Sequence, residues 1–267
     1  MVRQRYALGL TYEIIRGRWG LNSSSGRANQ TSMDLATLKI ILTIISGVCW
    51  TIVYIDGIRL GFKDKSYAIP FYALALNFAW ELLYTYHGFR INGVDVQNVF
   101  SAVWLTFDVG ILYTYFKFGR KYFYYPSAML RPSAQSSPRK RGGTEDATHN
   151  TSSAFIGWSV LGLITAFAIE YAFIREFGVA KGAAYSAFPQ NLLMSVLFIS
   201  MLARRGSREG QSLTIAVSKW LGTLAPTIVY GVLGASGFPR GSFLILMLGI
   251  LCSVFDLIYI RMLAKTK

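Results

Sequence analysis

The amino-acid sequence predicts an all-α, polytopic membrane protein built as a bundle of seven transmembrane helices. Of its 267 residues, 53% are hydrophobic and only 15% are charged, whereas soluble domains contain about 25% charged residues. Several apolar runs approach or exceed the roughly 18 residues that a helix needs to span a bilayer. The net charge of +14 lies mostly between and beside these runs, which is typical of membrane topology rather than of nucleic-acid binding.

The chain divides into three predicted parts. Residues 1–37 form a polar N-terminal arm, residues 38–263 the seven-helix transmembrane domain, and residues 264–267 a short C-terminal tail. The arm lacks the long apolar core of a signal peptide, so we expect the first span to act as a signal-anchor. Asn22 and Asn29 each begin an N-glycosylation tripeptide in this arm, which predicts a glycoprotein.

The seven spans are apolar runs separated by polar or basic links. A stretch rich in Ser, Pro, Gly and charge at about 117–152 predicts a flexible loop without a core of its own. Pro189 falls in the first turns of the fifth span, where proline is tolerated, and Pro226 predicts a kink in the sixth. The predicted spans are residues 38–55, 67–86, 98–116, 153–174, 184–203, 213–233 and 241–263.

An odd number of spans places the two termini on opposite sides of the membrane. Lys and Arg are concentrated in the links after the first, third and fifth spans and at the C-terminus. The positive-inside rule then predicts a cytoplasmic C-terminus. In a eukaryotic cell, we expect the endoplasmic reticulum membrane. We find no internal repeat in the sequence, which argues against an inverted-repeat transporter.

The stretch 71–86 carries the most informative residue, Glu81. Asn77 precedes Glu81 by four residues and Tyr84 follows by three, so the three side chains share one face of a helix. A carboxyl group in hydrocarbon costs at least about 2.5–3.5 kcal/mol, and it therefore faces the protein interior. Burial favours the neutral acid, which is able to donate a proton. The alternative is that Glu81 is only a hydrogen-bond partner between helices.

Glu81, Asp108, Glu170 and Asp256 all lie within predicted spans. Intramembrane acids indicate a functional site, and three functions compete for them: proton-coupled transport, ion conduction and acid catalysis. Lys219 lies near the predicted cytoplasmic end of its span, where we expect its side chain to extend to the membrane surface.

Aromatic residues accompany these acids. Trp80 lies beside Glu81, Trp104 is four residues before Asp108, and Tyr259 is one turn from Asp256. Some of these rings fit a membrane-interface belt, and others fit a lining that stabilises cations. The two cysteines fall within predicted spans, and the sequence contains no CxxC, HExxH, GxGxxG or GxxxxGK[ST] motif. We therefore expect no metal and no cofactor.

Three motifs in order resemble a known family. They are NxAWE at 77–81, AYSAFPQNLLMS in the fifth span and FDLIYI in the seventh. They are similar to motifs of the small integral-membrane terpene cyclases of meroterpenoid and indole-diterpene biosynthesis, such as the pyripyropene and paxilline cyclases. The resemblance covers about residues 35–265. This chain, like that family, lacks the DDxxD and DxDD motifs of other terpene cyclases.

The resemblance implies a secondary-metabolite enzyme that protonates the terminal epoxide of a prenylated aromatic, polyketide or indole substrate and directs a carbocation polycyclisation without metal. It implies partners that supply this substrate, namely a prenyltransferase and an epoxidase. The family's two acids correspond to Glu81 and Asp256, one donating the proton and the other relaying or orienting it. The residues expected to orient Glu81, stabilise cations or support the acids are Asn77, Trp80, Trp104, Asp108, Glu170, Asn191 and Tyr259.

The predicted depths of the acids leave their pairing open. At 1.5 Å per residue, Glu81 and Asp256 lie on the order of 15 Å apart along the membrane normal. Glu170 and Asn191 lie at a depth similar to that of Glu81, so Glu81 pairs either with them or, through helix tilt or a large pocket, with Asp256. The remaining alternative function is a seven-helix proton-coupled transporter or a small-molecule-binding membrane protein.

Overall fold

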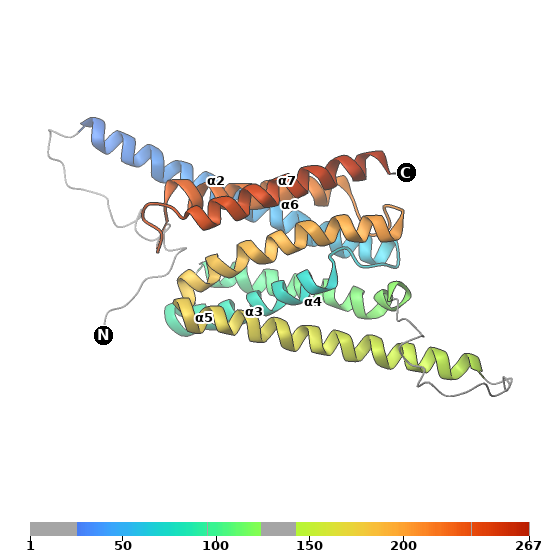
Figure 1. The fold of residues 1–267 in the computed structure, drawn as a ribbon. Coiled ribbons are helices and arrows are strands. Elements are labelled where there is room, and N and C mark those ends of the chain that lie inside the picture. Colours follow the sequence, from blue (N-terminus) through green and yellow to red (C-terminus); the bar gives the residue numbers. More distant parts are fainter. Residues whose placement is uncertain (1–25, 95, 124–142, 236, 267) are drawn as a thin grey trace.

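A computed structural model of the chain describes residues 26–94, 96–123, 143–235 and 237–266. No β-strand occurs within these ranges, and their helices confirm the predicted all-α class. The helices lie side by side in one elongated bundle (Figure 1). They are α2 (Gly26–Lys63), α3 (Phe71–Asn92), α4 (Val96–Phe118), the 3₁₀-helix η1 (Gly119–Tyr122), α5 (Gly143–Arg205), α6 (Leu213–Ile228), the π-helical turn η3 (Val229–Leu233) and α7 (Phe243–Lys265).

The described ranges contain six α-helices rather than seven, because α5 includes two of the predicted spans. Within α5, Gly178 has φ 73° and ψ 166°, a backbone conformation essentially restricted to glycine. The chain reverses there, and the two halves of α5 run in opposite directions (Figure 1). The predicted spans 153–174 and 184–203 lie in the first and second halves of α5, before and after Gly178.

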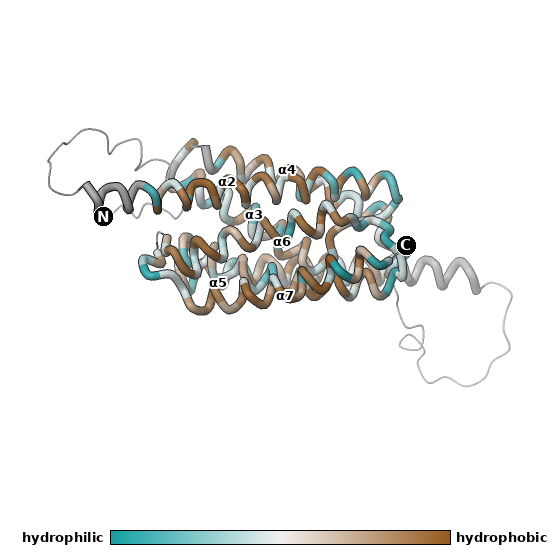
Figure 2. Tube along the Cα trace, turned by 90° about the horizontal axis from the view of Figure 1, so that it is seen from above, coloured by the Kyte–Doolittle hydropathy of each residue, from teal (hydrophilic) through white to brown (hydrophobic). Residues whose placement is uncertain are grey.

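Five helices in the described ranges, α2, α4, α5, α6 and α7, are long and apolar enough to cross a membrane. The 22-residue helix α3 is not among them; it carries buried polar side chains, including Asn77 and Glu81. Hydrophobic residues run along the helices, and hydrophilic residues gather towards their ends (Figure 2). This is the pattern of an integral membrane protein; seven crossings stay a prediction.

Several helix boundaries differ from the predicted ones. α2 begins at Gly26 rather than at residue 38, and α3 is Phe71–Asn92 rather than 67–86. α2 continues to Lys63 through the predicted first link, and within this extension Asp56 forms an ion pair with Arg59 one turn away. α5 begins at Gly143, so the loop predicted at 117–152 is shorter. Most of the N-terminal arm, including Asn22, and residues 124–142 lie outside the described residues, and only the backbone is described at Asn29.

Each α-helix makes its most extensive contacts with two others, and these contacts follow a closed ring. The order around the ring is α2, α4, α3, α5, α7 and α6, which returns to α2. The serine hydroxyls of Ser212 and Ser242 accept hydrogen bonds from the first turns of α6 and α7, and these caps fix where the two helices begin. Acidic side chains from several helices are buried between them, as expected for charged groups that avoid lipid.

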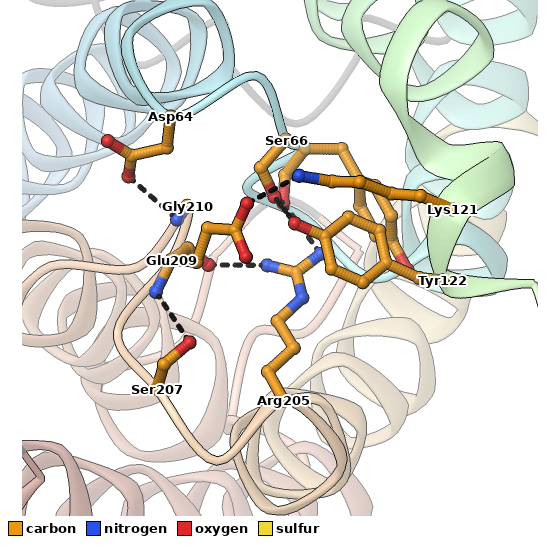
Figure 3. Close-up of polar contacts among 9 residues, drawn as sticks. Asp64, Ser66, Lys121, Tyr122, Arg205, Ser207, Glu209 and Gly210 are labelled. Carbon is orange, nitrogen blue, oxygen red and sulfur yellow. Dashed lines mark hydrogen bonds and ion pairs between the residues drawn. The ribbon is translucent and has the colours of Figure 1, made fainter.

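A polar cluster around Arg205 closes one end of the bundle (Figure 3). The Arg205 guanidinium lies 4.4 Å and 4.3 Å from the ring centroids of Tyr67 and Tyr122. It also donates hydrogen bonds to the backbone oxygens of Glu209 (2.7 Å) and Tyr67 (3.1 Å). Lys121 forms an ion pair with Glu209. This end cluster joins η1 to the α2–α3 and α5–α6 links, at the end where the C-terminus lies (Figure 1).

Candidate active site in the bundle interior

A buried hydrogen-bond network crosses the bundle at Asn77. The Nδ2 atom of Asn77 donates to the Tyr54 hydroxyl and to Oδ2 of Asp108, both at 2.8 Å. The Oδ1 atom of Asn77 accepts from Nε2 of Gln190, also at 2.8 Å. These residues belong to α2, α3, α4 and the second half of α5, and none is more than 8% exposed. Asn77 therefore joins four helical segments and fixes the Asp108 carboxyl rather than that of Glu81.

Glu81 and Asp108 form a pair of buried acids beside this network, which we call the acid pair. Glu81 is 3% exposed, Asp108 is fully buried, and the two carboxyl groups interact electrostatically. Oε2 of Glu81 and Oδ1 of Asp108 have no hydrogen-bond partner among the described residues. Because almost all buried polar atoms in folded proteins are paired, these two oxygens point to a bound ligand or water.

Glu170, on the first half of α5, belongs to a neighbouring polar group. Its member on α3 is Tyr84, about one helical turn beyond Glu81. Tyr84, Glu170 and Ser186 interact with one another, although their geometry leaves an oxygen of each without a hydrogen bond. Trp80 lies beside Tyr84, with ring centroids 5.0 Å apart. Among the described residues, eight of the twelve buried side-chain polar atoms without a partner belong to Glu81, Tyr84, Thr85, Asp108, Glu170, Ser186, Gln190 and Asn191.

Asp256 has a different environment from the acid pair. The Nζ atom of Lys219 donates to both Asp256 carboxylate oxygens, at 2.8 Å and 2.9 Å, and to Oγ of Ser195 at 2.7 Å. The Lys219 and Asp256 side chains are 0% and 1% exposed. The predicted extension of Lys219 to the membrane surface is therefore wrong, because a buried carboxylate holds its ammonium group inside the bundle. Neither oxygen of Asp256 is left without a partner.

The second half of α5 connects the three polar groups. Ser186 lies in the Glu170 group, Gln190 contacts Asn77, and Ser195 contacts Lys219. At 1.5 Å per residue, these side chains span about 14 Å along the helix. The sequence alone did not single out Gln190 or Ser195 as site residues, because an isolated amide or hydroxyl in an apolar run has no distinctive spacing.

Asn191 and two of the predicted cation-stabilising residues contribute little to this network. Asn191 is half-buried, and its Oδ1 has no partner in the described part of the chain. The Trp104 indole donates to the Thr51 hydroxyl at 3.1 Å. Tyr259 is buried and donates to the Gln211 side chain at 3.0 Å. Trp104 and Tyr259 are thus hydrogen-bonded to residues outside the network around Asn77.

Aromatic rings that the sequence did not single out pack against the network. Tyr54, which accepts the hydrogen bond from Asn77, lies 6.4 Å from Trp50 and 6.0 Å from Phe107 between ring centroids. Phe107 is also the residue before Asp108. Tyr54 thus brings a ring directly to the network, and Trp50 and Phe107 pack against that ring.

No three His, Cys, Asp or Glu side chains within the described ranges lie close enough together to hold a metal ion. The expectation that the protein uses no metal stays a prediction. The chemistry that the described site offers by itself is proton transfer, since its distinctive groups are carboxyls, amides and hydroxyls in an apolar surrounding.

Comparison with known proteins links this geometry to one family. The family model of the Pyr4-like transmembrane terpene cyclases matches residues 27–138 and 137–267, which together cover most of the chain. No solved structure shows a significant match.

Curated relatives from several fungi agree with this match. The chain is 28% identical over 206 residues to the Pyr4-family terpene cyclase mfmH of Annulohypoxylon moriforme, covering 76% of this chain and 74% of the relative. It is 29% identical over 212 residues to the terpene cyclase macJ of Penicillium terrestre, with the same coverage. It is 26% identical over 204 residues to the terpene cyclase atmB of Aspergillus flavus, again with 76% and 74% coverage.

Proposed function

Since the chain belongs to the Pyr4-like transmembrane terpene cyclases, we propose that it protonates the terminal epoxide of a prenylated aromatic, polyketide or indole substrate. Protonation opens the epoxide and starts a carbocation cascade that closes several rings. The prenyl group is of the farnesyl or geranylgeranyl class. The enzyme acts without metal, in the biosynthesis of a secondary metabolite.

The acid pair carries this proposal. Two carboxyl groups that interact inside an apolar bundle disfavour double ionisation, so at least one of them holds a proton. Glu81 Oε2 and Asp108 Oδ1 are the buried carboxyl oxygens of the pair that accept no hydrogen bond from any described residue. An epoxide oxygen placed against them accepts that proton as the carbon–oxygen bond breaks. We assign proton donation to Glu81, with Asp108 held by Asn77 as its partner.

The remaining steps require no further reagent. After the epoxide opens, each alkene of the prenyl chain attacks the cation in turn and a new cation forms further along. The rings of Trp50, Tyr54 and Phe107 are candidates to stabilise these cations through their π faces. Loss of a proton from the last cation completes an isomerisation and balances the proton donated at the start.

The topology and the partners belong to the same proposal. We propose seven membrane crossings, counting α3 and the two halves of α5 separately, with the C-terminus in the cytoplasm. The basic residues of the end cluster, Lys121 and Arg205, support this orientation because they lie at the C-terminal end of the bundle. In a eukaryotic cell the enzyme lies in the endoplasmic reticulum membrane. A prenyltransferase and an epoxidase act before it and supply its substrate.

The test is product formation by membranes that contain the full chain. An epoxyfarnesyl-aryl substrate is added to sealed membranes without an ion gradient and with a chelator present. We expect cyclised product from these membranes and none from membranes that lack the protein. A proton-coupled transporter gives no product under these conditions, and wild-type membranes that cyclise none of several such substrates would contradict the proposal.

A further inference from the structure

We propose that Lys219 keeps Asp256 ionised and that the two are positioning residues for the acid pair, so that Asp256 is not the proton donor. This assigns Lys219 a role that its position near the end of a predicted span did not suggest. The proposal rests on the proposed function for its effect on activity, but the charge state of Asp256 is independent of that function.

The geometry of the ion pair leaves Asp256 no proton to give. Both Asp256 oxygens accept hydrogen bonds from Lys219, and the third donor of the Lys219 ammonium reaches Ser195. An ammonium group has only three donors, so all of them are used. With both side chains at most 1% exposed, bulk water does not compete for these contacts. Each charge is stable there only because the other is present.

The acid pair has the opposite arrangement. In the described part of the chain, Glu81 and Asp108 each keep one buried oxygen without a partner, whereas no oxygen of Asp256 is in that state. A proton donor must present an oxygen to its substrate within hydrogen-bond distance. The acid pair therefore has carboxyl oxygens available to bind a substrate, whereas both oxygens of Asp256 are already hydrogen-bonded to Lys219.

A chain of contacts leads from the ion pair to the acid pair. The Ser195 hydroxyl accepts from Lys219 and donates to the backbone oxygen of Asn191 at 2.9 Å. Gln190, the preceding residue, donates to Asn77, which in turn donates to Asp108. The ion pair thus attaches α6 and α7 to the half of α5 that presents Gln190. Loss of either charge disturbs the segment that positions Asn77.

Infrared spectroscopy of the purified full chain in lipid nanodiscs, without substrate, tests the charge state. The carbonyl stretch of a protonated carboxyl group differs from the stretches of a carboxylate. We expect Asp256→Asn to leave the protonated-carboxyl absorption unchanged. Lys219→Met should add one such band, since a buried carboxylate without its partner takes up a proton, and Lys219→Met/Asp256→Asn should lack the added band. Loss of a protonated band in Asp256→Asn, or no gain in Lys219→Met, would overturn the proposal.

Activity rescue tests the positioning role. Lys219→Met and Asp256→Leu should each lower turnover by about 100-fold or more, because each breaks the buried ion pair that attaches α6 and α7 to α5. The double variant Lys219→Met/Asp256→Leu removes both charges and should recover to within about tenfold of wild type. As a control, Lys219→Met should not restore Glu81→Gln.

The two possible failures are distinguishable. If the double variant melts like wild type but is as inactive as Asp256→Leu, Asp256 acts directly on the substrate and the proposal is wrong. If wild-type membranes form no cyclised product, the proposed function fails, while the infrared bands still decide whether Lys219 keeps Asp256 ionised.

Discussion

Asn77 is the residue on which the geometry of the acid pair depends. It uses both donors of its amide and its acceptor, and its three partners are Tyr54, Asp108 and Gln190. Each partner would be left with an unpaired buried group if the amide were removed. A single side chain therefore fixes the orientation of one acid and the packing of the second half of α5.

Replacing this amide should be costly. We predict that Asn77→Leu lowers turnover at least about tenfold and destabilises the protein by about 1–3 kcal/mol, because it leaves buried polar groups without partners. Thermal melting and turnover in nanodiscs measure the two effects. Asn191→Leu is the matched control, since the side-chain Oδ1 of Asn191 has no hydrogen-bond partner among the described residues. Equal losses in both variants would argue against the network.

Among the individual site residues, the sequence predicted some and missed others for a physical reason. Helical spacing placed Asn77 and Glu81 on one face of one helix, and the structure has them on one helix, α3, with both side chains buried. Spacing gives no information on which helices face each other. Tyr54 and Gln190 are 23 and 113 residues from Asn77, so their contacts depend on the order of helices in the ring.

Among the helices, α5 is the element that organises the site, because it reverses at Gly178. The reversal places Ser186 and Gln190 opposite α3, with Glu170 on the first half of the same helix. The sequence predicted two spans here and a short link between them. It did not predict the single-residue reversal.

A side chain at Gly178 should oppose this reversal. We predict that Gly178→Ala destabilises the protein by about 1–3 kcal/mol, because residues with a side chain rarely adopt this backbone conformation. Gly157→Ala is the control, since Gly157 is helical and a methyl group there meets no other atom, as at Gly178. Melting temperatures of the two variants measure the difference, and an equal response of both would contradict this reading of α5.

The ion pair between α6 and α7 shows why helix-end lysines are difficult to interpret from sequence. Lys219 and Asp256 are 37 residues apart, and an isolated lysine near the end of a span is most simply placed at the membrane surface. Only the packing of α6 against α7 brings its partner within reach.

For the molecule as a whole, the end cluster joins η1 to the α2–α3 and α5–α6 links, which lie at the end of the bundle. Arg205 combines two aromatic contacts with two hydrogen bonds to backbone oxygens. We predict that Arg205→Ala lowers stability by about 2 kcal/mol or more, whereas Arg204→Ala at the exposed neighbouring position changes it by about 0.5 kcal/mol or less. A melting temperature for Arg205→Ala equal to that of Arg204→Ala would refute this role.

Glu209 makes the stability of this end sensitive to acid. Partial burial raises the pKa of Glu209, but interactions with Lys121 and Tyr122 lower it more, so the net pKa lies below the ordinary 4.5. A lowered pKa in the folded state stabilises the protein above about pH 4.5, and the effect is lost as the pH falls through the folded value. The melting temperature of wild type should therefore fall more than that of Glu209→Gln when the pH drops below about 4.5.

Turnover by Glu81→Gln, Asp108→Asn and wild type, at matched amounts of folded protein, tests the central claim most directly. General acid catalysis contributes about 10²–10⁴-fold, so Glu81→Gln should lose at least about 100-fold while its melting temperature stays near that of wild type. Asp108→Asn should also lose activity, because it removes the partner acid. Full turnover by well-folded Glu81→Gln would contradict the assignment of the proton donor and, with it, the function proposed for this site.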